Sequence, residues 1–175
     1  MKRPENLTKT VLHGLTAVFG ALILGFLALP YLAVKAVSAI GVPAMTKSGY
    51  DFLDFSTPNP TSEQTFSAVI VLLLVIFASV LIISAILSLL CDFGVLSNEK
   101  VAKLVKWLSV VSAVIVFVLA VLNIVACTNL VSATNEPFAA IAKVSPASAS
   151  IAGLVLNLLC AGGASACALY DTIRK

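Results

Sequence analysis

A long uncharged run in the middle of the chain constrains the fold more than any other feature. From Gln64 to Cys91 the sequence holds no charged residue, and the stretch from Ala68 to Phe77 is entirely apolar. A helix of that length reaches about 40 Å, which exceeds the roughly 30 Å hydrocarbon core of a bilayer. Helices of water-soluble proteins are rarely so long and so apolar on every face. The run therefore predicts a membrane-spanning helix.

The composition of the chain leads to the same conclusion. Only 11% of the 175 residues are charged, against about 25% in a soluble domain, and the mean hydropathy is +1.09. So few charges do not cover a water-exposed surface, and most of the surface must therefore face lipid. The small net charge of +3, without basic runs interleaved with aromatic residues, argues against a nucleic-acid partner.

Three further apolar runs complete a set of four expected spans within one domain over residues 1–175. The first run is too long for a signal peptide, whose apolar core is about 7–15 residues, and Pro30 is expected to kink it. Short connections then predict an all-α, up-down-up-down antiparallel bundle with two external loops. The four spans are expected at residues 11–40, 65–91, 106–127 and 151–170.

The distribution of basic residues predicts the orientation in the membrane. The two chain ends and the connector between the second and third spans hold most of the Lys and Arg residues. Such an excess marks the cytoplasmic side, so we expect a multi-pass plasma-membrane protein with both termini in the cytoplasm. The glycosylation sequon at Asn6 falls on that side, and the lack of a usable external sequon favours a prokaryotic inner membrane.

Two asparagines fall inside expected spans, where polar groups are costly and therefore informative. Asn123 and Asn157 should lie at similar depth in antiparallel neighbours, where their amides would hydrogen-bond across the helices and fix the register. The alternative is a polar lining for a small pore or ligand site, which Ser84 and Ser88 would extend. We favour the structural pair.

The fourth span also carries a stripe of small residues at helical spacing. A stripe of this kind lets neighbouring backbones approach closely, so it predicts a helix-packing seam inside the bundle, with an oligomer interface as the alternative. It consists of Gly153, Asn157, Ala161, Ser165 and Ala168.

The first external loop contains a compact patch of aromatic and acidic side chains. One interpretation is that its aromatic residues fold down as a lid or anchor the loop in the headgroup layer, where Tyr is favoured. The other is a docking surface for a partner membrane protein or an extracellular polymer. We favour the lid or anchor. The patch consists of Tyr50, Asp51, Phe52, Leu53, Asp54 and Phe55.

Residues that carry catalysis or hold cofactors are scarce in this sequence. No pair of its four cysteines has Cys-x-x-Cys spacing, and His13 is the single histidine, so neither a metal site nor any other cofactor is expected. We also expect no buried Asp, Glu or Arg in any span, which argues against proton-coupled transport. The chain has no phosphate-binding glycine loop and no Ser-His-Asp candidate set, so no enzyme activity is expected.

The layout resembles that of small four-span membrane proteins with two external loops, such as claudins and tetraspanins. The Trp-Gly-Leu-Trp motif of claudins and the Cys-Cys-Gly motif of tetraspanins are absent, so no functional residue is carried over. We expect a non-enzymatic accessory, scaffold or interaction subunit that acts through its external loops or helix seam. Its expected partners are the lipid bilayer and either another membrane protein or a further copy of the chain. The alternative is a small oligomeric channel or transporter lined by the intramembrane Ser and Asn residues.

Overall fold

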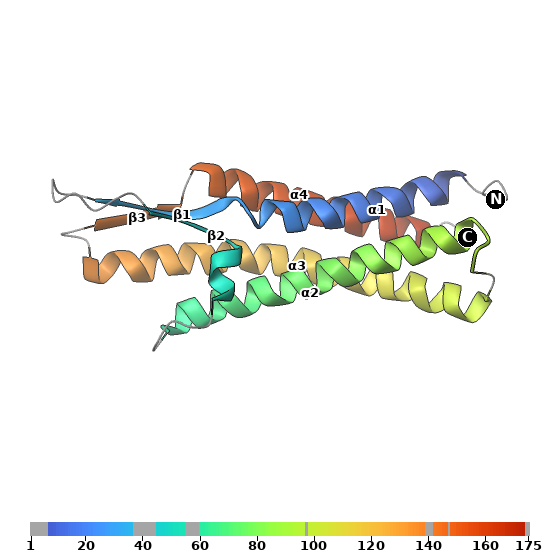
Figure 1. The fold of residues 1–175 in the computed structure, drawn as a ribbon, viewed down its shortest axis with the longest axis horizontal. Coiled ribbons are helices and arrows are strands. Elements are labelled where there is room, and N and C mark those ends of the chain that lie inside the picture. The colour runs from blue at the N-terminus through green and yellow to red at the C-terminus, as the bar shows by residue number, and fades with distance from the viewer. Residues whose placement is uncertain are drawn as a thin grey trace.

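Four long helices run side by side along the molecule (Figure 1). The computed structural model describes residues 7–36, 45–54, 60–96, 98–138, 142–146 and 148–173. Each helix is long and apolar enough to cross a membrane, as expected of a multi-pass membrane protein. The helices are α1 (Leu7–Phe26), α2 (Ser62–Asp92), α3 (Glu99–Phe138) and α4 (Ser148–Ile173).

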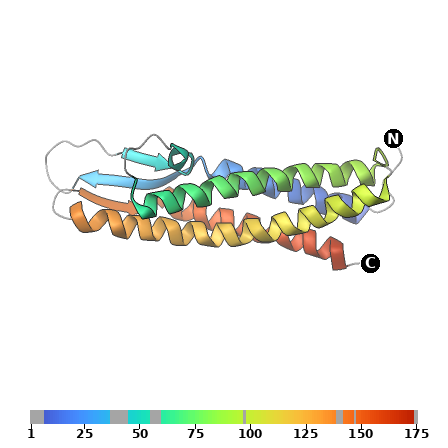
Figure 2. The same ribbon diagram turned by 90° about the horizontal axis from the view of Figure 1, so that it is seen from below.

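Each helix packs against two others. α1 contacts α2 and α4, and α3 contacts the same two helices from the other side. Figures 1 and 2 show the start of α1, the end of α4 and the connection between α2 and α3 at one end of the molecule, which we call the connector end. Three short strands lie at the opposite end, which we call the sheet end.

The first span is shorter than the predicted helix over residues 11–40. α1 ends at Phe26, and strand β1 (Pro30–Ala36) follows it. The chain leaves the helix through a tight turn, in which the Leu29 amide donates to the Phe26 carbonyl at 3.1 Å. Pro30 has no N–H with which to extend the helix, and its ring would clash with the carbonyl four residues earlier. The prediction was therefore wrong beyond this turn, because the proline ends the helix instead of kinking it.

Both connecting segments at the sheet end contribute to one sheet, which the sequence analysis did not predict. β1 pairs antiparallel with β2 (Met45–Ser48) on one side and with β3 (Ala142–Pro146) on the other. In this register Val34 faces Met45 of β2 and Val144 of β3. The fold is thus a set of four helices with a small sheet at one end.

Capping residues set the starts of the two long central helices. Thr61 and Gln64 form a capping box at α2, since each side chain bonds the other residue's backbone amide. Asn98 caps α3, where its Oδ1 accepts from the Lys100 amide at 3.0 Å. This start lies well before the predicted span at 106–127, and the helix continues to Phe138, so α3 is longer than expected at both ends.

Between the two ends, the interior is filled by apolar side chains. Ile23, Val71, Leu74 and Val116 have no exposed surface, and the small residue Ala161 of α4 is fully buried among them. Large apolar side chains on the outer faces are exposed instead, as a lipid-facing surface requires. They include Ile76, Val118, Val125 and Leu159.

Candidate functional site

The two predicted intramembrane asparagines meet at a third residue near the sheet end. The hydroxyl of Tyr31 accepts from Asn157 Nδ2 at 3.0 Å and from Asn123 Nδ2 at 3.4 Å. All three side chains are buried, and burial raises the pKa of Tyr31 to about 12. The phenol is therefore neutral under physiological conditions. The two amides share one hydroxyl, and this links α3 and α4 to the strand that follows α1.

The small-residue stripe of α4 faces other helices of the same chain. A Cβ added at Gly153 would lie 3.3 Å from Leu29 Cδ1, just beyond the end of α1. Ser165 Oγ donates to the carbonyl of Ala113 in α3 at 2.9 Å. The remaining members of the stripe are buried: Asn157, Ala161 and Ala168. The stripe thus packs inside the chain.

The aromatic-acidic patch folds down onto the helices. It forms the short helix η1 (Tyr50–Leu53), and Tyr50 Oη donates to the Leu24 carbonyl of α1 at 2.7 Å. Phe52 and Leu53 pack against the apolar core. These contacts favour a lid over a free docking surface. Phe55 lies outside the described residues.

One acidic member of the patch stabilises the lid locally. Asp51 Oδ2 accepts from the amide of Ser48 at 2.6 Å and from its hydroxyl at 3.0 Å. The neighbouring Gly49 amide donates to the Leu27 carbonyl at 2.8 Å, so the turn between β2 and η1 is seated on the end of α1. Asp54, which closes η1, is exposed.

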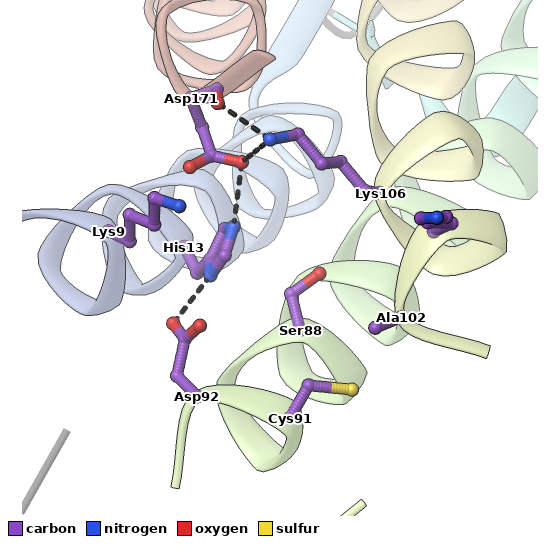
Figure 3. Close-up of a pocket in the computed structure, with 9 residues that line it drawn as sticks. Lys9, His13, Ser88, Cys91, Asp92, Ala102, Lys106 and Asp171 are labelled. Carbon is purple, nitrogen blue, oxygen red and sulfur yellow. Dashed lines mark hydrogen bonds and ion pairs between the residues drawn. The ribbon is translucent and has the colours of Figure 1, made fainter. Parts of the chain in front are cut away.

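At the connector end, each of the four helices contributes one charged residue to a cluster that the sequence analysis did not predict (Figure 3). His13 of α1 lies between two carboxylates, with Nδ1 2.8 Å from Asp92 Oδ2 and Nε2 3.5 Å from Asp171 Oδ2. Lys106 Nζ lies 2.9 Å from Asp171 Oδ2 and donates to the Asp171 carbonyl at 2.6 Å. These contacts form a chain through α2, α1, α4 and α3, which we call the ion cluster.

The ion cluster overturns the expectation that no span holds a buried acidic residue. Asp171 is only 4% exposed, and the side chain of His13 is also largely buried. The burial of Asp171 was not predicted because this residue lies near the end of a span, where a charge is normally solvated. Its spacing from Ala164 and Ala168, four and then three residues, places it on the same helix face as the stripe. This continuation of the buried stripe was the feature of the sequence that could have indicated a buried Asp171.

The two carboxylates beside His13 favour a protonated imidazole. An imidazole donates from both nitrogens only when it is protonated, so a His13 that donates to both Asp92 and Asp171 carries a positive charge. Asp171 Oδ2 is then shared by two cations, His13 and Lys106. Its other oxygen, Oδ1, is buried and has no hydrogen-bond partner among the described residues.

A cavity of about 210 Å³ adjoins the ion cluster. Lys9 and Lys103 line it, and within the described part of the chain neither has a carboxylate within 4 Å. The lining therefore holds three lysines and two aspartates, and both aspartates already have partners in the ion cluster. The complete lining is Lys9, His13, Ser88, Cys91, Asp92, Ala102, Lys103, Lys106 and Asp171.

Other chemistry has little support in the part of the chain that the structure describes. That part holds no group of three or more His, Cys, Asp and Glu residues arranged to bind a metal ion. All four cysteines are free thiols. The cavity beside the ion cluster is therefore the strongest candidate site for a ligand.

Comparisons with known proteins add no assignment. No protein-family model matches the chain, and no curated protein or solved structure matches it either. The function is therefore inferred from the arrangement of this chain's own residues.

Proposed function

We propose that this protein is a non-enzymatic integral membrane protein that acts by association, as an accessory or scaffold subunit. The observation that carries the proposal is the folded cap at the sheet end, formed by β1, β2, β3 and η1. Two connecting segments far apart in the sequence pair into one sheet there, and hydrogen bonds from Tyr50 and Gly49 seat the cap on α1. A pre-formed surface of this kind favours recognition because little ordering is needed on binding.

The pairing order supports a contact role for the cap. β1 is the central strand, so β2 and β3 each have one edge that no described strand pairs. Free edges offer backbone donors and acceptors to a further strand, which is a recurring mode of protein recognition. The side chains of Thr46 and Lys47 on β2 are exposed. The proposed contact surface is therefore the β2 side of the cap, with a membrane protein or a second copy as the partner.

The packing of the interior gives the channel alternative less support. Asn123 lies about 25 Å beyond Lys106 along α3, so the asparagines and the ion cluster lie far apart along the bundle. Fully buried apolar residues such as Leu81 and Val116 lie between them. Ser84 Oγ donates to the Leu81 carbonyl of its own helix. A polar path along the bundle axis would have to pass this apolar region.

The proposed orientation places the connector end in the cytoplasm of a plasma membrane. Four lysines of the described helices lie near that end: Lys9, Lys100, Lys103 and Lys106. The three lysines toward the sheet end are Lys35, Lys47 and Lys143. The rule that basic residues concentrate on the cytoplasmic side therefore favours a cap that faces outward.

Site-specific photo-crosslinking in living cells tests the proposal. A photo-reactive amino acid at Thr46 should yield one discrete protein adduct, either a partner or a differently tagged copy of the chain. The matched control at Ile76, which is 46% exposed at the middle of α2, should yield lipid adducts only. Lipid adducts or no adducts at Thr46, with Thr46 and Ile76 behaving alike, would contradict association through the cap.

A further inference from the structure

The cavity at the connector end has features that association through the opposite cap does not use. We propose that it binds a phosphate ester that also carries a hydroxyl group. Two sources have this chemistry: the headgroup of a glycerol-type anionic phospholipid and free glycerol phosphate. The proposal is independent of the cap, because the two sites lie at opposite ends of the helices (Figure 1).

Charge is the first argument for a phosphate. Lys106 and His13 are engaged by Asp171 and Asp92, but Lys9 and Lys103 line the cavity without a carboxylate within 4 Å among the described residues. Two ammonium groups that line one cavity without a carboxylate partner favour an anion beside them. Lysine binds phosphate as a point charge with three donors, so these two residues suit a phosphodiester or phosphomonoester.

Each of the two cavity lysines stands near the start of a helix. α1 and α3 both begin at the connector end, where Lys9 stands in the first turn of α1 and Lys103 near the start of α3. The partial positive charge at a helix N-terminus favours an anion. The partial negative charges at the ends of α2 and α4 lie at the same end of the molecule and oppose this effect. Asp92 and Asp171 in their last turns add little further negative charge, because the ion cluster pairs them with cations.

The unsatisfied oxygen of Asp171 specifies what else the ligand should carry. Asp171 Oδ1 is buried and has no partner among the described residues, and a buried polar atom without a hydrogen bond is unfavourable. An anion alone would leave this oxygen unpaired. A hydroxyl group beside the phosphate would donate to it, so glycerol phosphate fits both demands. Figure 3 shows that Asp171 directs only one of its two carboxylate oxygens toward His13 and Lys106.

Size and surroundings agree with a headgroup. The cavity of about 210 Å³ far exceeds the roughly 10–15 Å³ that one water needs, and it is smaller than the roughly 300–1,000 Å³ of drug-sized sites. Trp107, next to Lys106, is 65% exposed, which suits a residue at headgroup depth. Leu104 is similarly exposed on the adjoining turn of α3, so an acyl chain would find an apolar surface beside the cavity. Basic cavities between membrane helices are suited to anionic headgroups.

Lipid binding to the purified full-length protein tests the proposal. The probes are nanodiscs and native mass spectrometry with phosphatidylglycerol, phosphatidylcholine or phosphatidylmethanol, which has the same charge as phosphatidylglycerol but no headgroup hydroxyl. We expect phosphatidylglycerol to be retained about tenfold more tightly than phosphatidylcholine, and several-fold more tightly than phosphatidylmethanol. The double variant K9Q/K103Q should lose the tenfold preference. The control K47Q removes one lysine at the sheet end and should keep it.

The outcomes separate the sources of the phosphate. Competition by free glycerol phosphate at millimolar concentration would identify a soluble anion site, and retention of the lipid despite it would identify the headgroup. Equal retention of phosphatidylglycerol and phosphatidylcholine would overturn the proposal, as would equal losses in K47Q and in K9Q/K103Q. Equal retention of phosphatidylglycerol and phosphatidylmethanol would overturn the role of Asp171. Unchanged melting temperatures of the variants would show that they are folded.

Discussion

Tyr31 shows how one side chain joins elements that the sequence keeps far apart. It lies on β1, but its hydroxyl serves an asparagine on α3 and another on α4. The depth of Asn123 and Asn157 could be predicted from their positions in apolar runs. Their partner could not, because Tyr31 reaches them only if the chain leaves the helix before Pro30. A continuous helix through residue 40 would have placed this phenol in another direction.

Replacing Tyr31 by Phe should destabilise the protein and alter its titration. The two amides lose their shared acceptor, which should lower the free energy of unfolding by about 1–3 kcal/mol. In the folded protein Tyr31 has a pKa of about 12, against about 10 in an unfolded chain. The folded state therefore holds this proton more tightly, so the resulting stability is present below pH 10 and is lost as the pH rises toward 12. A phenolate absorbance titration and thermal unfolding in detergent would measure both effects.

The sequence contains three tyrosines, which makes the titration specific. The variant should lack the ionisation step at the highest pH, and the steps of the two remaining tyrosines should stay in place. If the variant keeps the late step, that step belongs to a group other than Tyr31. The raised pKa of Tyr31 would then be disproved.

Asp171 is the residue on which the ion cluster depends most. Its Oδ2 contacts both His13 and Lys106, so the change Asp171→Asn removes the counter-charge of two cations at once. Breaking a buried ion pair from one side costs about 3–5 kcal/mol, and a partly open cluster should lie at or below the lower limit. Thermal unfolding of Asp171→Asn should therefore show a clear drop, whereas Glu99→Gln, at an exposed position, should change little.

A double-mutant cycle separates pairing from packing in the same cluster. If Lys106 acts through Asp171, the change Lys106→Met should cost much less in the Asp171→Asn background than in the wild-type protein. A coupling of about 1 kcal/mol or more would support the pair. Additive effects of the two substitutions would show that they do not interact.

At the scale of elements, the seat of η1 on α1 depends on one glycine. A Cβ at Gly49 would lie 2.8 Å from the Leu27 carbonyl oxygen and 3.2 Å from Leu27 Cδ2. Because the nearer atom belongs to the backbone, the turn has to move away from α1. We expect Gly49→Ala to lower the free energy of unfolding by about 1–3 kcal/mol and to speed proteolysis of the loop between β2 and α2.

Gly14 provides the matched control. No atom lies within 4 Å of a Cβ built there, and its backbone is helical. Alanine is the better helix former by about 0.5–1 kcal/mol, so Gly14→Ala should leave the melting temperature unchanged or raise it slightly. Equal losses for the two substitutions would show that the Gly49 contact has no special role.

Elements with a long apolar pattern could be predicted, whereas those defined by long-range pairing could not. The run from Gln64 to Cys91 lies wholly within α2 because hydrophobicity and length alone require a helix in lipid. β1 was read as helix because its residues continue an apolar run, although Pro30 marks the break. β3 pairs with β1 across more than a hundred residues of sequence. The pattern of apolar and polar residues within either segment does not indicate this pairing.

At the scale of the whole molecule, the two ends differ in what holds them together. The sheet end is closed by strand pairing and by the neutral Tyr31 hydroxyl, and the connector end by the ion cluster. Charged groups keep favourable solvation where headgroups and water reach them, while a neutral node is tolerated deeper in the bundle. This difference is what the proposed orientation and the phosphate site both require.

Labelling from one side of the membrane tests that arrangement. In a background with the four native cysteines replaced by alanine, Lys47→Cys introduces an exposed thiol on β2, and Val95→Cys introduces one in the exposed connection between α2 and α3. A membrane-impermeant maleimide should modify the first in intact cells and the second only after permeabilisation, because the helix α2 between them has to cross the bilayer. Reaction of both thiols in intact cells would mean that α2 returns to the same side or lies outside the membrane. Reaction of only the Val95→Cys thiol would keep the four spans but reverse their orientation, and the phosphate site would then face outward.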